Sequence, residues 1–107
     1  MQPSWIQEAV ERNFEMVVKH RRYLHAYPEL SFRESHTCEY LAGVLTDWEV
    51  PFEPKGETGL VAYLRGEQPD AATIALRADT DALPIHEASE VPYASRNEGV
   101  MHACGHD

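Results

Sequence analysis

Apolar residues between Ser4 and His25 recur every three or four positions, and this period constrains the fold more than any other feature of the chain. The period places one apolar stripe along an α-helix. Pro28 then restricts the backbone of Tyr27 and disfavours further helix. We therefore predict an amphipathic helix from Ser4 to about His25. The residues that follow the period are Ile6, Val10, Phe14, Val17, Val18 and Leu24.

A second helical period starts a few residues later. Ser31 and Glu34 match the capping-box pattern S-x-x-E, in which two side chains satisfy free amides at a helix start. We expect a helix from about Phe32 to Thr46, with the small side chain of Cys38 buried inside it. The apolar positions of this period are Phe32, Cys38, Leu41, Val44 and Leu45.

Alternation and turn-forming residues replace the helical period in the middle of the chain. Polar and apolar residues alternate over 49–53, and residues 60–64 and 73–77 are apolar runs of strand length. Because the connection at 66–70 is short and rich in turn formers, we predict a hairpin between 60–64 and 73–77. The run 73–77 is apolar on both faces, which is typical of a central strand in a covered sheet.

The rest of the chain predicts a long loop. Residues 84–103 show no period, and long loops in compact domains are commonly functional. The expected fold class is therefore α/β, with two helices followed by sheet strands and a long loop. A length of 107 residues suits one small domain with its own core.

Composition argues against several classes of partner. The net charge of -9 disfavours nucleic acid, because phosphate binding needs clustered Lys and Arg. No stretch approaches the roughly 20 apolar residues of a membrane span, and Glu8 and Glu11 stand where a signal peptide is apolar. We expect a soluble cytoplasmic protein with no nucleic-acid or membrane partner. Its two cysteines, Cys38 and Cys104, are then expected to be reduced.

The last six residues, His102 to Asp107, hold a thiol, two imidazoles and a carboxylate. In an extended backbone His102, Cys104 and His106 would face one side, and Gly105 would let the chain approach a bound group. Thiolate and imidazole favour zinc and its neighbours, and a carboxylate broadens the choice toward manganese. The pattern predicts a partial metal site. For His102 alone, a packed or exposed loop histidine is the favoured interpretation.

A second candidate site follows the run 73–77. Asp79 and Asp81 lie two positions apart at the carboxyl end of that run, where ligands gather in open α/β sheets. Two such carboxylates repel each other unless a cation or a positive side chain lies between them, and Arg77 shares their side of the strand. The alternative is a solvated acidic loop.

Three blocks of sequence, in this order, carry a resemblance to a known enzyme family. They are RYLHAYPELSFRE at 22–34, LRADTDALP at 76–84 and GVMHACGHD at 99–107. Together they resemble the amidohydrolase branch of the aminoacylase and carboxypeptidase metallohydrolases, which includes hippurate hydrolases. The resemblance covers nearly the whole chain, and the three blocks together are far more specific than any one of them.

The resemblance implies a site with two divalent metal ions, zinc or manganese, with cobalt and nickel as alternatives. Cys104 matches the thiolate that bridges the two ions, and His106 matches an imidazole ligand of one of them. Asp81 matches a carboxylate that orients a ligand and raises its basicity. Asp79 stands where other branches of the family place a metal-binding His. His102 and Asp107 match supporting positions.

The resemblance also implies a reaction and a size. A metal-bridging water, deprotonated by a Glu, attacks the amide carbonyl of an N-acylated amino acid. Residues 1–107 would then be the first portion of a zinc-peptidase-like catalytic domain, since the base, further ligands and a dimerisation domain lie downstream in the family. We expect this chain alone to be inactive and a full-length protein to be a homodimer. The alternative is a non-catalytic truncated module with weak metal binding.

Overall fold

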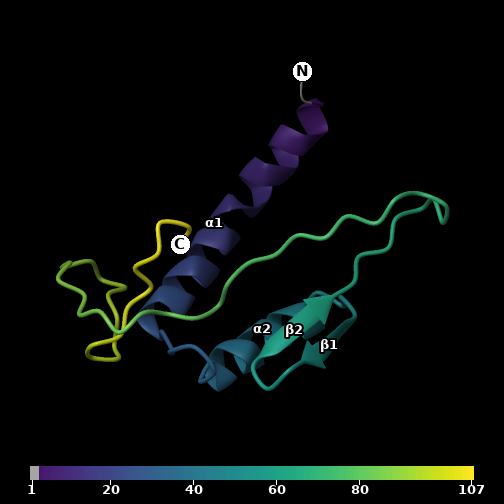
Figure 1. Cartoon of the computed structure of the whole chain (residues 1–107). Coiled ribbons are helices and arrows are strands. Elements are labelled where there is room, and N and C mark those ends of the chain that lie inside the picture. The colour runs from purple at the N-terminus through teal and green to yellow at the C-terminus, as the bar shows by residue number, and fades with distance from the viewer. Residues whose placement is uncertain (1–2) are drawn as a thin grey trace.

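Two helices and one β-hairpin make up the regular structure of residues 3–107, the part of the chain that the computed structural model describes. Helix α1 spans Ser4–Ala26 and helix α2 spans Ser35–Asp47. Strand β1 spans Phe52–Lys55 and strand β2 spans Gly59–Ala62. A long irregular segment then returns to the carboxyl-terminal end of α1 (Figure 1). None of the described helices is long and apolar enough to cross a membrane.

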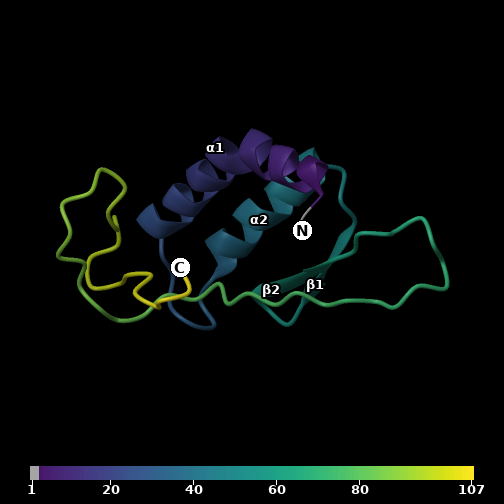
Figure 2. The same ribbon diagram turned by 90° about the horizontal axis from the view of Figure 1, so that it is seen from above.

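Helix α1 confirms the first predicted helix and extends it by one residue. Only His25 and Ala26, in its last turn, are buried. Large apolar side chains of α1 are exposed, with exposed fractions of 56–67% at the four positions that follow. These positions are Trp5, Val10, Phe14 and Val17. The amino-terminal half of α1 therefore projects from the body of the molecule (Figure 1), and α2 lies between α1 and the hairpin in the view of Figure 2.

Aromatic side chains join α1 to α2. The Tyr23 ring stacks on the Tyr40 ring with centroids 4.0 Å apart and an interplanar angle of 15°. A hydrogen bond of 2.6 Å links His20 Nδ1 to Tyr40 Oη, and one of 3.0 Å links Tyr23 Oη to His36 Nε2. An aromatic pair of this kind contributes about 0.5–1.5 kcal/mol beyond the area it buries.

The predicted capping box at the start of α2 is wrong. Helix α2 begins at Ser35, three residues after the predicted start at Phe32, and the side chain of its N-cap residue Glu34 makes no capping bond. Glu34 Oε1 instead accepts a hydrogen bond of 2.9 Å from the amide of Phe32. Phe32 has a positive φ of 64°, so the chain around Ser31 is a turn and not the first turn of a helix.

A more distant carboxylate satisfies the free amides at the start of α2. Glu29 Oε1 accepts from the amide of Thr37 at 2.6 Å and from its hydroxyl at 2.7 Å. Glu29 Oε2 accepts from the amide of His36 at 3.3 Å. Because a helix amino terminus has unpaired N–H groups and a partial positive charge, a carboxylate is favourable there.

The hairpin differs from the predicted one. Strand β1 pairs with β2 in antiparallel register from Phe52↔Ala62 to Lys55↔Gly59, around a turn in which Gly56 has a φ of 64°. The predicted partner, 73–77, forms no strand in the described chain. The shorter loop is the physical reason, because closing it costs less chain entropy and Gly56 tolerates the left-handed turn.

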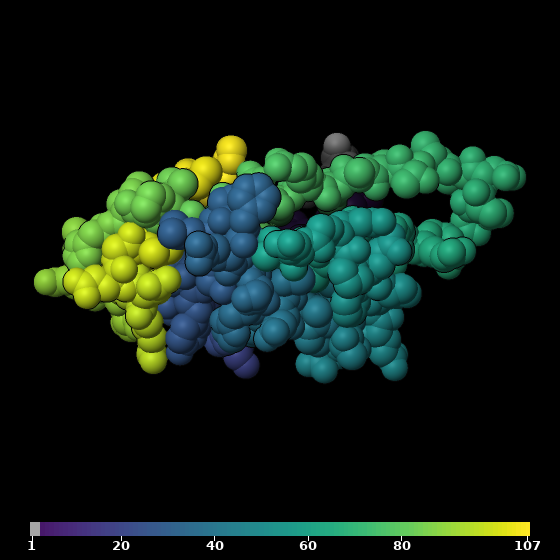
Figure 3. Space-filling model, turned by 60° about the horizontal axis from the view of Figure 1, so that its bottom comes forward, coloured from purple at the N-terminus to yellow at the C-terminus, as the bar shows by residue number. Residues whose placement is uncertain are grey.

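The run 73–77 lies in an exposed arm that stands clear of the body (Figure 3). Ile74 is 83% exposed and Leu76 is 98% exposed. Its apolar composition is that of a buried strand, but in the described residues the sheet contains only β1 and β2, and 73–77 pairs with neither. The expectation of a central strand is therefore wrong for this structure.

Short backbone bridges bring the chain back to the connection between α1 and α2. The amide of Ala82 donates to the carbonyl of Glu29 at 2.7 Å, and Leu30 and Ala82 form a parallel bridge. Leu83 and Met101 form an antiparallel bridge with two hydrogen bonds of 2.9 and 3.0 Å. The buried apolar residues of the described chain lie near these bridges, namely Ala26, Pro28, Ala82 and Val100. Residues 84–103 contain no helix or strand, which confirms the predicted loop.

Candidate metal centre

The four residues from Cys104 to Asp107 form a turn, which we call the metal turn. The amide of Asp107 donates to the carbonyl of Cys104 at 3.1 Å and closes it. Inside the turn, Cys104 Sγ lies 3.8 Å from His106 Nδ1, and both side chains are exposed. The structure therefore brings together the thiol and the imidazole that the sequence predicts as metal donors.

His102 does not join this pair. Because the chain turns at 104–107, the expected extended backbone with three donors on one side is wrong. The His102 ring is half-buried and lies 6.5 Å from the His25 ring, centroid to centroid. Its Nε2 atom is buried without a hydrogen-bond partner. Within residues 3–107, no three His, Cys, Asp or Glu side chains converge closely enough to hold an ion.

Asp81 approaches this region from the other side of the Leu83–Met101 bridge. Burial lowers the pKa of His102, while the carboxylates of Asp107 and Asp81 act in the opposite direction. Asp81 is thus close to His102. Its role as the residue that orients a metal ligand stays a prediction.

Asp79 belongs to a separate, exposed ion pair. Arg77 Nη2 lies 2.7 Å from Asp79 Oδ1, and the two side chains are 84% and 59% exposed. Arg77 therefore offsets the charge of one of the two neighbouring aspartates, Asp79, as the strand period suggested. The exposure of the pair fits the solvated-loop alternative for Asp79.

A buried histidine that the sequence analysis did not select, His25, lies behind the metal turn. Its Nδ1 is 3.0 Å from Asp107 Oδ2 and its Nε2 is 3.0 Å from Glu87 Oε1. Each ring nitrogen of His25 therefore lies beside a carboxylate oxygen. Arg21 Nη2 also donates to Asp107 Oδ2, at 3.1 Å. We call Arg21, His25, Glu87 and Asp107 the His25 cluster.

The carboxylate of Glu87 accepts hydrogen bonds from three residues. The hydroxyl of Ser89, the amide of Ser95 at 2.7 Å and the ring of His25 all donate to its carboxylate. Through these bonds, first that of Ser89, the pKa of Glu87 falls from 4.5 to about 2, although burial opposes the change. The side chains of His25 and Glu87 are each only 5% exposed. The cluster therefore places the carboxylates of Glu87 and Asp107 on either side of the His25 ring, with Arg21 beside Asp107.

Local sequence patterns do not predict this cluster, because its members are far apart in the sequence. His25 is separated from Glu87 by 62 positions and from Asp107 by 82 positions. The available signal was the presence of His25 inside the block 22–34, at the end of a helix. An aromatic ring completes the surroundings, since Tyr93 lies 5.8 Å from the His25 ring and 4.7 Å from the Arg22 guanidinium.

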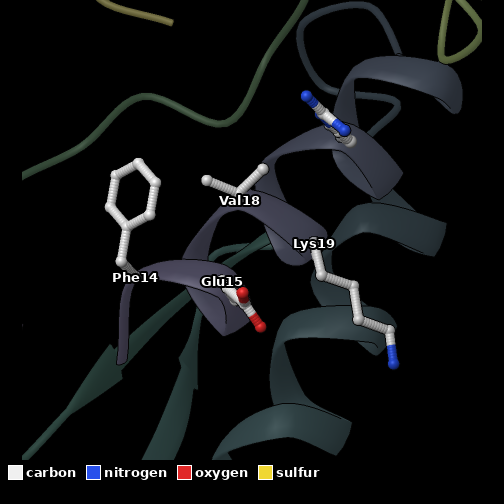
Figure 4. Close-up of a pocket in the computed structure, with 5 residues that line it drawn as sticks. Phe14, Glu15, Val18 and Lys19 are labelled. Atoms are coloured by element: carbon white, nitrogen blue, oxygen red, sulfur yellow. The ribbon is translucent and has the colours of Figure 1, made fainter. Parts of the chain in front are cut away.

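A surface hollow on α1 lies apart from the predicted metal residues. It has a volume of about 420 Å³ and is lined by residues of α1 alone, which are Phe14, Glu15, Val18, Lys19 and Arg22. Figure 4 shows Phe14 and Val18 on one side of the helix and Lys19 pointing away from them. None of the predicted metal residues lines it.

Comparison with known proteins shows which proteins the segment that contains the metal turn resembles. Residues 75–107, which contain Asp81, Cys104 and His106, match the model of Peptidase family M20/M25/M40. The YXEP protein of Bacillus subtilis, a dinuclear metal binding peptidase from the M20 family, superposes with a TM-score of 0.82 at 39% identity. The chain is homologous to part of an M20-family peptidase. The superposition covers 90% of this chain and 27% of the YXEP chain.

Further proteins are similar to this chain over most of its length. A solved structure from methicillin-resistant Staphylococcus aureus superposes with a TM-score of 0.88 at 40% identity, over 98% of this chain and 28% of its own. Uncharacterized hydrolases of Staphylococcus saprophyticus and Staphylococcus epidermidis are 54% and 50% identical over 93 residues, which is 87% of this chain. The chain spans about a quarter, 24%, of the length of these two hydrolases. Its two helices and hairpin thus match part of an M20 peptidase.

Proposed function

We propose that this chain supplies part of a two-metal amidohydrolase site, in which Cys104 and His106 bind divalent cations. The separation of 3.8 Å between Cys104 Sγ and His106 Nδ1 carries the proposal. Two such donors on one tetrahedral zinc ion lie about 3.6 Å apart, given a Zn–S distance of about 2.3 Å and a Zn–N distance of about 2.05 Å. The donor types suit zinc, with manganese, cobalt and nickel as alternatives.

The proposal assigns separate roles to Cys104, His106 and Asp81. Divalent ions bound here would supply a water molecule of lowered pKa for attack on a carbonyl carbon. Cys104 acts as the bridging thiolate, and His106 acts as a ligand through its imidazole. Asp81 orients a neighbouring ligand from the other side of the loop. The exposure of the metal turn leaves room for a substrate to approach it.

The proposed substrate is the amide bond of an N-acylated amino acid, in the manner of an aminoacylase or hippurate hydrolase. Its support is the ordered set of three blocks at 22–34, 76–84 and 99–107, together with the homology to a dinuclear metal binding peptidase. A cytoplasmic location and a homodimer of the full-length protein belong to the same proposal. The 107-residue chain itself is expected to be inactive.

The first test is cobalt binding by the 107-residue chain. Titration with Co²⁺ should produce the near-ultraviolet absorption of a thiolate bound to cobalt. Cys104→Ser should abolish this absorption, and Cys38→Ser should retain it because Cys38 lies in α2, where its Sγ faces the Gly59 carbonyl at 3.8 Å. Equal absorption from both variants would contradict the proposed ligand.

The second test is hydrolysis. Release of free amino acid from N-acetyl and N-benzoyl substrates, with added Zn²⁺ or Mn²⁺, is expected from a full-length protein and not from this chain. Turnover by the chain that Cys104→Ala abolishes would contradict the expected inactivity.

The second candidate function is a non-catalytic module with weak metal binding. One observation favours it, since only two donors converge at the metal turn in the part of the chain that the structure describes. Cobalt binding through Cys104, combined with no hydrolysis by a full-length protein, would select this function.

A further inference from the structure

We propose that the His25 cluster positions the metal turn. Arg21 and His25 are positioning residues: they hold the carboxylate of Asp107 and thereby fix the backbone that presents Cys104 and His106. This inference rests on the proposed metal function and adds residues of α1 to that site.

The contacts of Asp107 are the first argument. Asp107 follows His106 directly and closes the metal turn through its amide. Its Oδ2 atom accepts from Arg21 Nη2 at 3.1 Å and from His25 Nδ1 at 3.0 Å. Residues four positions apart lie on the same face of a helix, so one rigid turn of α1 provides both donors.

The opposite end of the loop is also held. Met101, three positions before Cys104, is bonded to Leu83 in both directions at 2.9 and 3.0 Å. Between these two attachments, Cys104, Gly105 and His106 are exposed, and a Cβ placed on Gly105 would meet nothing within 4 Å. Because exposed loop residues are more mobile than the elements they connect, the orientation of this turn depends on its two attachments.

Burial is the second argument. Glu87 holds the Nε2 side of the His25 ring, and Glu87 is itself held by Ser89 and Ser95. The side chains of His25 and Glu87 are each 5% exposed, whereas those of Asp107 and Arg21 are 22% and 44% exposed, so the cluster is anchored in the interior and reaches the surface at the metal turn. Groups that orient metal ligands from outside the coordination sphere have this form, with each member hydrogen-bonded to the next.

The test is the Co²⁺ affinity of the 107-residue chain, measured by thiolate absorption. Arg21→Met should weaken binding by about 10–100-fold, as is usual when such a partner is lost. Arg22→Met is the matched control, because Arg22 carries the same charge beside the same Tyr93 ring, at 4.7 Å, and makes no bond to Asp107. It should leave the affinity unchanged. Arg21→Lys, which keeps the charge and one donor, should restore part of the affinity.

The sign of the Arg21→Met effect separates positioning from simple electrostatics. Removing a positive charge near a cation site would strengthen cation binding by Coulomb's law, whereas loss of positioning weakens it. Asp107→Asn should also weaken binding, and the double variant Arg21→Met/Asp107→Asn should bind no more weakly than Asp107→Asn alone. The free energy of unfolding without metal, measured for each variant, reports any purely structural loss.

Two results would overturn the inference, and they are distinguishable. If Cys104→Ser abolishes the absorption while Arg21→Met binds Co²⁺ as tightly as the unmodified chain or more tightly, only the positioning role fails. If the unmodified chain gives no Cys104-dependent absorption, the proposed metal function fails and the inference fails with it. Should Asp107→Asn not fold, the comparison of Arg21→Met with Arg22→Met decides alone.

Discussion

Glu87→Gln should remove a stabilising contribution that disappears in acid. Glu87 has a side chain only 5% exposed and a pKa lowered from 4.5 to about 2. A difference of about 2.5 between these two values corresponds to about 3 kcal/mol in the free energy of unfolding, because each unit is worth about 1.4 kcal/mol. A carboxyl group whose pKa is lower in the folded state contributes its full stabilisation at pH values above its pKa in the unfolded chain. That contribution is lost as the pH falls from 4.5 toward 2.

The assay is urea unfolding of the unmodified chain and of Glu87→Gln at a series of pH values between 7 and 2. Gln has the shape of a protonated Glu, so the two proteins should differ by up to about 3 kcal/mol at pH 7 and converge as the pH approaches 2. Glu90→Gln is the control, since Glu90 is an exposed carboxylate on the same loop. It should change the free energy of unfolding by less than about 0.5 kcal/mol.

Two outcomes would refute the reasoning about Glu87. A difference between the two proteins that stays constant from pH 7 to pH 2 would show that the charge of Glu87 is not responsible. A difference below about 0.5 kcal/mol at pH 7 would show that the bonds from Ser89, Ser95 and His25 do not stabilise the folded chain.

Two further predictions concern the fold. Glu29→Ala should lower the free energy of unfolding by about 1–3 kcal/mol, because α2 loses the carboxylate that accepts from His36 and Thr37; Glu29→Gln should lose less. Urea unfolding measures both, and an unchanged midpoint for Glu29→Ala would contradict this capping role. Leu76→Ser should change the stability of the chain by less than about 0.5 kcal/mol, because Leu76 is 98% exposed. A larger loss in the same assay would show that Leu76 is buried in solution.

The helices and the loop could be predicted because their signals are local. Apolar residues that recur every three or four positions define the apolar face of a helix, and this pattern does not depend on the rest of the chain. Helix α1 and most of α2 therefore lie where the sequence places them, and 84–103 is the expected loop. The start of α2 could not be predicted, because Glu29 provides a cap from outside the S-x-x-E pattern.

The candidate donors were visible for the same reason. Cys104 and His106 lie two positions apart, so a single turn is enough to bring Sγ within 3.8 Å of Nδ1. The chemistry of thiolate and imidazole then predicts a metal, whatever the rest of the fold may contain. The position of His102 was not predictable, because the same turn separates it from the other two donors.

What the sequence alone determined is the set of local features: two amphipathic helices, a turn-rich middle, a loop, and a thiol and an imidazole two positions apart. Only the tertiary structure decided that β1 is the partner of β2 and that His25 lies between Glu87 and Asp107. Periodicity encodes which face of an element is apolar, but it carries no record of which distant residue that face will meet. Contacts across 62 and 82 positions depend on how the whole chain closes, and they are what joins α1 to the metal turn.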